Sequence, residues 1–244
     1  MKPKILAVIP ARGGSKGIKN KNLKKLLGRP LIAYTILAAK KSKLITDIVV
    51  SSDSEKILGL ARQFGLVVIK RPKFLATDKA SSIDAVIHAV FQTEKLFGYR
   101  YDLVVMLQPT TPLKTAKDID QSLQKLIASR ADSVISVVRS PGINPEWMKY
   151  IVNDQLVDID NRKIENASRQ KDQIYIRNGA IYATRRNTLV HKKTFKGGHC
   201  LPYVMPTELW VNIDGPRDWK LAELIMKNKI NYDRPKPIQK RFSS

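Results

Sequence analysis

Short apolar runs alternate with segments of helical periodicity along the first 138 residues of the chain. The apolar runs predict buried strands at 5–10, 47–52, 66–69, 102–107 and 133–138. The helical spacing of apolar residues predicts helices that begin at Pro30 and that cover 54–64, 81–97 and 118–127. This alternation is typical of an α/β fold with a mostly parallel sheet flanked by helices, in which ligands bind at the carboxyl ends of the strands.

The regular pattern breaks between residues 139 and 177. Prolines, asparagines and aspartates, which favour turns, surround short strand-like pieces such as 148–152 in this segment. We therefore expect 139–177 to be an inserted arm.

The rest of the chain completes the domain. Apolar runs predict returning strands at 179–183 and 201–205, and helical spacing predicts a closing helix at 217–229. A chain of 244 residues suits one sizeable domain. We expect a single α/β domain over 1–230, followed by a basic C-terminal tail at 231–244.

The composition is strongly basic, with 44 Lys and Arg against 21 Asp and Glu and a net charge of +23. Such a charge suits a nucleic acid, a membrane surface or anionic small substrates. The basic runs do not alternate with aromatic residues as a base-stacking platform would, and this pattern argues against a nucleic-acid partner.

The single cysteine and the short first apolar run bear on the compartment and on membrane association. Cys200 is the single cysteine, so the chain forms no internal disulfide and no thiolate metal cage, and the cytoplasm is the expected compartment. The first apolar run lies between Lys4 and Arg12 and is too short to cross a bilayer, so no membrane association is expected.

The segment after the first predicted strand, residues 11–22, is rich in glycine and positive charge. It holds three glycines and four cations, namely Gly13, Gly14, Gly17, Arg12, Lys16, Lys19 and Lys21. Glycines let backbone N–H groups approach phosphate oxygens, and the cations neutralise phosphate charge. The spacing is neither that of a dinucleotide-binding loop nor that of a P-loop. The segment predicts a phosphate site of a different kind, with a flexible basic turn as the alternative.

Five blocks that span residues 5–223 resemble, in the same order, the acylneuraminate cytidylyltransferases. The blocks are IPARGGSKGI followed by Lys21-Asn22, Arg71-Pro72 with LATDKASS at 75–82, LQPTTPL at 107–113, NGAIY at 178–182, and Asn212-Ile213-Asp214 with Asp218-Trp219. The resemblance implies a Rossmann-like nucleotidyltransferase fold. It also implies transfer of CMP from CTP to the anomeric hydroxyl of a sialic, legionaminic or pseudaminic acid, with release of pyrophosphate.

The resemblance assigns the nucleotide site. Catalytic roles fall to Arg12, Lys21 and Asp214. The residues implied to bind CTP are Ala11, Arg12, Gly13, Gly14, Ser15, Lys16, Lys21, Asn22, Arg71, Ala80 and Ser82. Asp214 would hold Mg²⁺, which is normally shared between carboxylates, water and substrate phosphates. Many relatives carry a second Asp where this chain has Asn212, and Asp218 is expected to cap the closing helix.

The resemblance also assigns the acceptor site and the assembly. The residues implied to contact the acidic sugar are Gln108, Arg169, Gln170, Tyr175 and Asn178. The enzyme is expected to be a homodimer in which the arm at 139–177 reaches over the partner's sugar site.

Each assignment has a simpler alternative. Ser82 could serve only at a helix N-terminus, Gln108 could satisfy loop backbone, and Tyr175 could be a packing aromatic. Asn178 could belong to a turn that enters a strand. Alternative functions are a cytidylyltransferase for an eight-carbon 3-deoxy sugar acid or another small acceptor, a sugar 1-phosphate nucleotidyltransferase, and a nucleic-acid binder.

Overall fold

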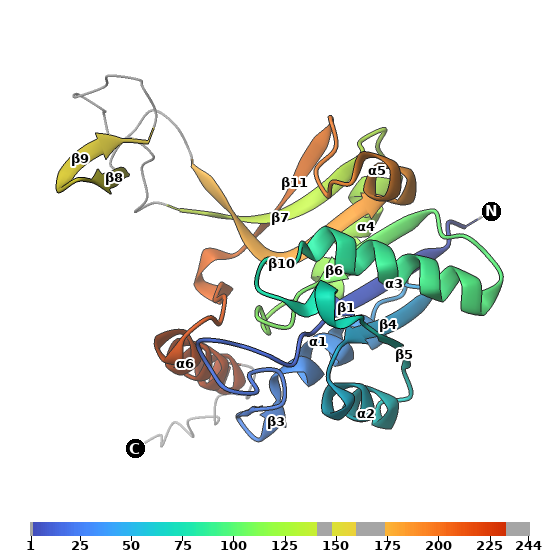
Figure 1. The fold of residues 1–244 in the computed structure, drawn as a ribbon, viewed down its shortest axis with the longest axis horizontal. Helices are drawn as coiled ribbons and strands as arrows, with labels where there is room; N and C mark the ends of the chain where they lie inside the picture. The colour runs from blue at the N-terminus through green and yellow to red at the C-terminus, as the bar shows by residue number, and fades with distance from the viewer. Residues whose placement is uncertain (1, 141–147, 160–173, 233–244) are drawn as a thin grey trace, which may run out of the picture.

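The computed structural model describes residues 2–140, 148–159 and 174–232, and within these ranges a seven-stranded sheet forms the centre of the protein (Figure 1). In spatial order its strands are β11 (Cys200–Met205), β7 (Ser133–Arg139), β10 (Tyr175–Arg185), β6 (Leu103–Leu107), β1 (Ile5–Pro10), β4 (Asp47–Ser52) and β5 (Val67–Lys70). Four neighbouring pairs are parallel, and only β10 runs antiparallel to its neighbours. The prediction of a mostly parallel sheet is confirmed.

Helices cover both faces of the sheet. The helices are α1 (Leu31–Lys40), α2 (Glu55–Gln63), α3 (Ser82–Phe97), α4 (Ala116–Ile127), α5 (Arg186–Lys192) and α6 (Pro216–Tyr232). Alternate side chains of β1 point to opposite faces, so Ile9 packs in the core with α1, α2 and α4, whereas Val8 packs with α3 and α5. The α6 helix instead packs through Trp219 on Ile18 and Leu26, in the segment that follows β1.

Local signals set the helix ends. The Ser81 hydroxyl accepts the Ile83 N–H at the start of α3, and Gly98 ends that helix at φ 75°. Thr115 and Asp118 form a capping box, in which each side chain accepts the other residue's backbone N–H, so α4 begins at Ala116. The predicted start at residue 118 was therefore late, because Asp118 belongs to the cap.

The β10 strand differs from the sequence prediction. The expected strand at 179–183 extends over Tyr175–Arg185, so residues 175–177 of the expected arm belong to the main sheet. The register against β7 shifts between Arg177 and Tyr182, and Gly179 adopts φ 77° within this bulge. Asn178 and Gly179 therefore lie inside a strand and not in a turn that enters one.

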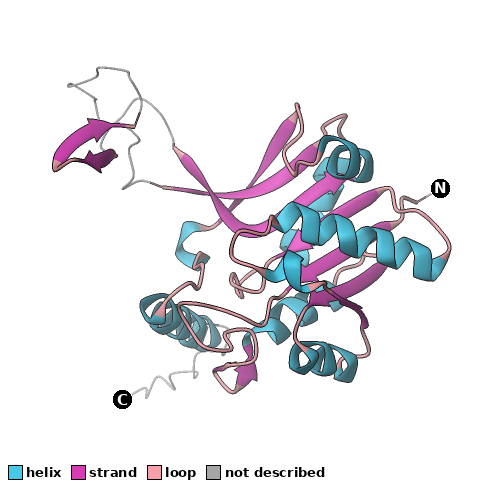
Figure 2. Cartoon of the chain, viewed as in Figure 1, coloured by secondary structure: helices cyan, strands magenta, loops and turns pink. Residues whose placement is uncertain are grey.

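Small elements complete the described chain. They are the hairpin of β2 (Lys25–Leu26) and β3 (Arg29–Pro30), the hairpin of β8 (Lys149–Val152) and β9 (Gln155–Asp158), and the 3-10 turns η1 (Lys73–Ala76) and η3 (Thr207–Leu209). Figure 2 shows the β8–β9 hairpin standing apart from the main sheet. Its strands carry exposed apolar side chains, notably Ile151 at 75% and Leu156 at 74% exposure. Across the described ranges, we find no helix with the length and apolar character needed to cross a membrane.

Candidate active site

The loop over residues 11–22 lies at the carboxyl end of β1 and is attached to the neighbouring strand β4. The Ala11 N–H donates to the Ser51 carbonyl at 2.9 Å, and the Gly13 N–H donates to the Asp53 carboxylate at 2.8 Å. This is the edge at which open parallel sheets bind ligands. The structure therefore places the predicted phosphate loop where the fold favours a site.

Polar side chains within the loop fix its shape. The Ser15 hydroxyl donates to the Ile18 carbonyl at 2.7 Å and accepts the Lys21 N–H at 3.2 Å. The Asn22 amide donates to the Arg12 carbonyl at 3.1 Å, and Asn22 is buried. These bonds hold the backbone in a compact turn, so Ser15 and Asn22 organise the loop whether or not they also contact a ligand.

Gly17 is the closest point between this loop and the segment before α6. A Cβ atom at Gly17 would lie 1.9 Å from the Asp214 carbonyl oxygen, which no side chain tolerates. At Gly14, by contrast, a Cβ atom would meet nothing within 4 Å. Gly17 thus permits the loop to lie directly against Asp214, a role that the spacing of glycines alone did not predict.

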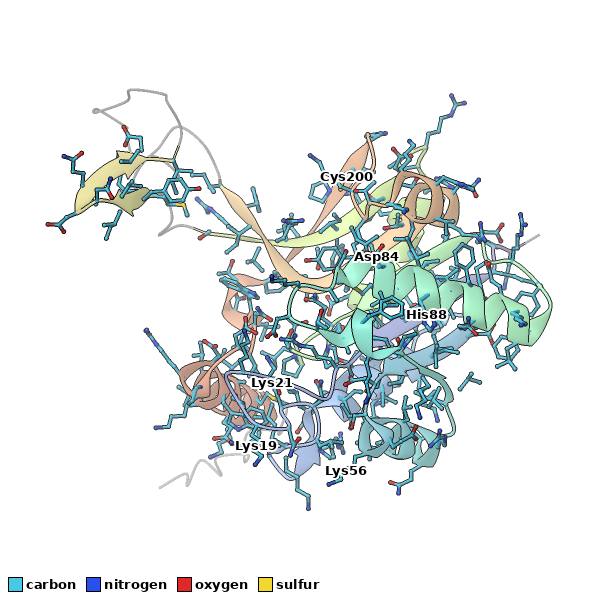
Figure 3. The ribbon with its side chains drawn as sticks, in the orientation of Figure 1. Lys19, Lys21, Lys56, Asp84, His88 and Cys200 are labelled. Atoms are coloured by element: carbon cyan, nitrogen blue, oxygen red, sulfur yellow. The ribbon has the colours of Figure 1, made fainter. Side chains whose placement is uncertain are left out.

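Lys21 joins the loop to the same segment. Its side chain is 11% exposed, and its ammonium lies 2.7 Å from the Ile213 carbonyl and 3.2 Å from the Asp214 carboxylate. Figure 3 shows Lys21 and the exposed Lys19 on the loop close to α6. Lys21 and Asp214, which the resemblance assigns to phosphate and metal chemistry, are therefore in contact, and Arg12 lies in the same loop as Lys21.

Arg12 and Lys16 share a carboxylate that the sequence did not single out. Asp78, between η1 and α3, accepts from Arg12 at 2.6 Å and pairs with Lys16 at 2.8 Å. The hydrogen bonds from Lys16 and Arg12 lower the pKa of Asp78. Asp78 lies within the LATDKASS block, but an aspartate in a loop gives no sign that it will meet two cations from the loop after β1.

Arg71 lies behind this loop as a buried cation. Its guanidinium donates to the Ser51 hydroxyl at 3.3 Å and to the Ser51 carbonyl at 2.9 Å, and burial lowers its pKa. His88, on α3, has a pKa lowered by burial and then by Arg71, and its Nδ1 has no hydrogen-bond partner among the described residues. Ala80 and Ser82 lie just before and at the start of α3.

A cleft of about 370 Å³ opens beside these residues. Its lining residues are Ser82, Ile83, Met106, Gln108, Arg177, Asn178, Gly179, Tyr182, Phe195, Trp210 and Asn212. Gln108 lies just past the end of β6, and its amide oxygen would be 2.9 Å from a Cβ atom at Gly179. Gly179 therefore leaves the space that the Gln108 side chain occupies.

The other residues predicted to contact the sugar differ in exposure and in position. Asn178 is 2% exposed, its amide oxygen accepts from the Ser136 hydroxyl at 2.6 Å, and its amide nitrogen lies 3.0 Å from the Met205 sulfur. Its side chain is thus held by β7 and β11, although the residue also lines the cleft. Tyr175 is half-exposed at the start of β10, and Arg169 and Gln170 lie outside the described residues.

Oxygen ligands for a metal ion are available at Asp214. The Asn212 side-chain amide nitrogen donates to the Asp214 carboxylate at 2.8 Å. The side-chain oxygen of the same amide, Oδ1, has no hydrogen-bond partner among the described residues. In the same ranges no three His, Cys, Asp or Glu residues are grouped as a metal site. Asp218 accepts the N–H groups of Asp214 and Gly215, which confirms its predicted capping role.

Comparison with known proteins decides the family. The model of the cytidylyltransferase family matches residues 6–211, which is most of the chain. The chain belongs to this family. The cytidylyltransferase match includes the loop after β1, the Arg71 segment and the Gln108 loop, so the resemblance seen in the sequence is confirmed.

Relatives of this cytidylyltransferase cover nearly all of its length. N-acylneuraminate cytidylyltransferase of Escherichia coli O18:K1:H7 is 35% identical over 100% of the chain, which spans only 57% of that relative's length. CMP-N,N'-diacetyllegionaminic acid synthase of Legionella pneumophila is 35% identical over 92% of the chain and 97% of its own length. Pseudaminic acid cytidylyltransferase of Campylobacter jejuni is 32% identical over 94% of the chain and 98% of its own length.

Solved structures share the fold at much lower identity. CMP:2-keto-3-deoxy-manno-octonic acid synthetase in complex with CTP superposes with a TM-score of 0.68 at 18% identity, over 93% of this chain and 99% of that chain. The 4-diphosphocytidyl-2C-methyl-D-erythritol synthase of Anaerococcus prevotii gives a TM-score of 0.63 at 14% identity, over 93% and 100% of the two chains. The Rossmann-like nucleotidyltransferase fold is thereby confirmed.

Proposed function

We propose that this cytidylyltransferase transfers CMP from CTP to a nonulosonic acid of the sialic, legionaminic or pseudaminic type. The anomeric hydroxyl oxygen attacks the α-phosphorus, the bond from that phosphorus to the β-phosphate oxygen breaks, and pyrophosphate leaves as the hydroxyl proton is lost to solvent. The observation that carries the proposal is the adjacency of a cationic loop and a cleft at one edge of the sheet. The names of the three relatives support the acceptor class.

The cationic loop is proposed to bind the triphosphate. Arg12, Lys16 and Lys21 provide three positive charges at the end of β1, and Gly13 and Gly14 give close access to the backbone. Phosphoryl transfer depends mainly on positioning and on stabilising charge on the transferred and leaving groups. CTP would replace the Asp78 carboxylate as the partner of Arg12 and Lys16, because phosphate oxygens offer the stronger charge.

The pyrimidine is proposed to lie between the loop and α3. Arg71 supplies a nearly buried guanidinium, and the backbone at Ala80 and the Ser82 hydroxyl supply donors and acceptors for a base edge. Ala11, Ser15 and Asn22 are expected to support this site through the loop that they shape.

The acceptor sugar is proposed to occupy the cleft of about 370 Å³. Gln108 presents an amide there, while Met106 and Phe195 give the cleft an apolar part that suits N-acyl groups. We assign Asn178 to the cleft wall, Tyr175 at the start of β10 to acceptor binding, and Arg169 and Gln170 to acceptor binding from the arm.

A magnesium ion is proposed to bind at Asp214. The Asp214 carboxylate and the side-chain carbonyl oxygen of Asn212, which accepts no hydrogen bond from the residues that the structure describes, are hard oxygen ligands of the kind that Mg²⁺ takes. Substrate phosphates commonly complete such a site. Bound there, the ion would supply positive charge that stabilises the phosphates. The presence of Asn212 instead of a second carboxylate is compatible with this assignment because an amide carbonyl is also a ligand for Mg²⁺.

The enzyme is proposed to act as a homodimer in the cytoplasm. The β8–β9 hairpin exposes Tyr150, Ile151 and Leu156 at 56–75%, which is unfavourable unless another surface covers them. The single cysteine, Cys200, is free and suits a reducing compartment.

A pyrophosphate-release assay tests the function. The protein is incubated with CTP, Mg²⁺ and, in separate reactions, a sialic, a legionaminic, a pseudaminic or an eight-carbon 3-deoxy sugar acid, with glucose 1-phosphate as a control acceptor. We expect pyrophosphate with at least one nonulosonic acid, and none when UTP replaces CTP. Release with the eight-carbon acid alone would favour the alternative that the fold of the octonic acid synthetase suggests. Release with the sugar phosphate alone would contradict the proposal.

A further inference from the structure

Lys114 is a buried cation beneath the cleft, and no step of the proposed reaction uses it. Its side chain is 4% exposed. Its ammonium lies 2.7 Å from the Gln108 carbonyl, 2.7 Å from the Thr111 carbonyl, 3.0 Å from the Thr35 hydroxyl and 3.3 Å from the Thr111 hydroxyl. All four partners are neutral oxygens. Burial lowers the pKa of Lys114 to about 7, so the ammonium depends on these hydrogen bonds, and they keep Lys114 and the loop in one arrangement.

The loop needs such a donor because of its sequence. Residues 108–113 follow β6 and contain Pro109 and Pro112, neither of which has a backbone N–H. The Gln108 carbonyl accepts from the Thr111 hydroxyl at 3.1 Å and, at the longer distance of 3.5 Å, from the Thr111 N–H and the Thr35 hydroxyl. Lys114 therefore provides the closest hydrogen bond to the Gln108 carbonyl, and it ties that carbonyl to Thr35 of the buried helix α1.

Both routes from Lys114 end at the wall of the cleft. One route runs through the Gln108 backbone to the Gln108 side chain, which lines the cleft. The other runs through the Thr111 hydroxyl, which lies 3.3 Å from the carbonyl of Gly179, and Gly179 lines the cleft directly against the Gln108 amide oxygen. Lys114 is not among the residues that line this cleft, so it acts through its neighbours.

We propose that Lys114 is a positioning residue that holds Gln108 and Gly179 in the geometry that binds the sugar acid. This inference rests on the proposed function, because it takes the cleft to be the acceptor site. It predicts a selective effect: the affinity for the sugar acid depends on Lys114, whereas the affinity for CTP does not. Within the described part of the chain, the hydrogen bonds of Lys114 go to Thr35, Gln108 and Thr111, whereas the cationic loop after β1 is held by Asp53, Asp78 and Asp214.

Steady-state kinetics on Lys114→Met tests the selective effect. Methionine keeps the unbranched shape and removes the three donors, and Lys114→Arg retains donors as a rescue variant. At saturating CTP we expect the KM for the accepted sugar acid to rise about tenfold in Lys114→Met, as for the loss of a well-placed hydrogen bond, and to be partly restored in Lys114→Arg. The Kd for CTP, measured by calorimetry, is expected to stay within about twofold of wild type.

Two further variants keep the test decisive. Thr111→Val breaks the same network without burying or removing a charge, and we expect it to raise the sugar KM about threefold. It decides the question if Lys114→Met does not fold. Lys125→Met is the matched control, because Lys125 bonds one backbone carbonyl, that of Pro202, at an exposed position on α4. Its sugar KM is expected to equal that of wild type.

The outcomes separate the inference from the proposed function. If the wild-type enzyme turns over a nonulosonic acid but the folded variants leave the sugar KM unchanged, or weaken CTP and sugar binding equally, the role of Lys114 is overturned and the proposed function stands. If the wild-type enzyme releases no pyrophosphate with any nonulosonic acid, the proposed function fails and the inference fails with it.

Discussion

Gly17→Ala probes the contact between the phosphate loop and the segment that carries Asp214. The new Cβ atom would lie 1.9 Å from the Asp214 carbonyl oxygen, whereas ordinary contact begins at 3.4 Å, so one backbone must move by about 1.5 Å. Overpacking of this kind costs about 2 kcal/mol, which corresponds to a fall in Tm of about 6 °C for a chain of this size. A displacement of about 1 Å at a reacting centre lowers the rate about 100-fold, and we expect a similar loss in kcat/KM.

Two alanine variants provide the controls for Gly17→Ala. Gly14, in the same loop, and Gly59, in α2, each leave nothing within 4 Å of an added Cβ atom. Gly14→Ala is expected to keep the wild-type Tm, and Gly59→Ala to raise the stability by about 0.5–1 kcal/mol because alanine favours a helix. Calorimetry and the pyrophosphate assay give the two readouts. Wild-type values of both Tm and kcat/KM for Gly17→Ala would refute the reasoning.

Three further predictions address charge, assembly and acid stability. Lys21→Met should lower kcat/KM about 10- to 100-fold, because a charged phosphate contact is lost. Lys19→Met, at an exposed position in the same loop, should keep the wild-type kcat/KM. Equal losses for the two variants in the pyrophosphate assay would argue against a special role for Lys21. Replacing Ile151 and Leu156 together by Asp should convert a dimer into a monomer in sedimentation, with a wild-type monomer as the contrary result. Hydrogen bonds from the backbone N–H groups of His199 and Gly198 and from the Thr188 hydroxyl lower the pKa of Asp132 from 3.8 to about 2. The stability that Asp132 contributes is therefore present above about pH 4 and is lost as the pH falls towards about 2. The free energy of unfolding, measured with urea, should depend less on pH in that window for Asp132→Asn than for wild type. The same pH dependence in both proteins would contradict this.

The sheet and its large helices were predictable because their signals are local. The apolar run of β1, the Ser81 cap and the Gly98 stop of α3 lie in the sequence itself. The α5 helix was missed because it is seven residues long, has Leu189 as its one fully buried apolar side chain, and ends at Lys193 instead of at a glycine. The antiparallel direction of β10 was also missed, since strand pairing is a tertiary property that a short apolar run does not encode.

The site was predictable to the extent that motifs place residues at the ends of strands. Arg12 and Lys21 were expected together because they follow one strand, and the structure places both in the loop after β1, with Lys21 against Asp214 and Arg12 against Asp78. Asp78 and Lys114 were not singled out, because their importance depends on partners that lie far along the chain, 66 residues for Asp78 with Arg12 and 79 for Lys114 with Thr35. In a chain so rich in lysine, no local pattern marks Lys114 as a residue that folding buries.

The most direct measurement of the central claim is a crystal structure of the protein soaked with CTP and Mg²⁺. We expect density for the triphosphate along residues 11–22, with phosphate oxygens in contact with Arg12 and Lys21 and with Lys16 released from Asp78. A nucleotide bound elsewhere, with this loop unchanged and its ion pairs to Asp78 intact, would contradict the account.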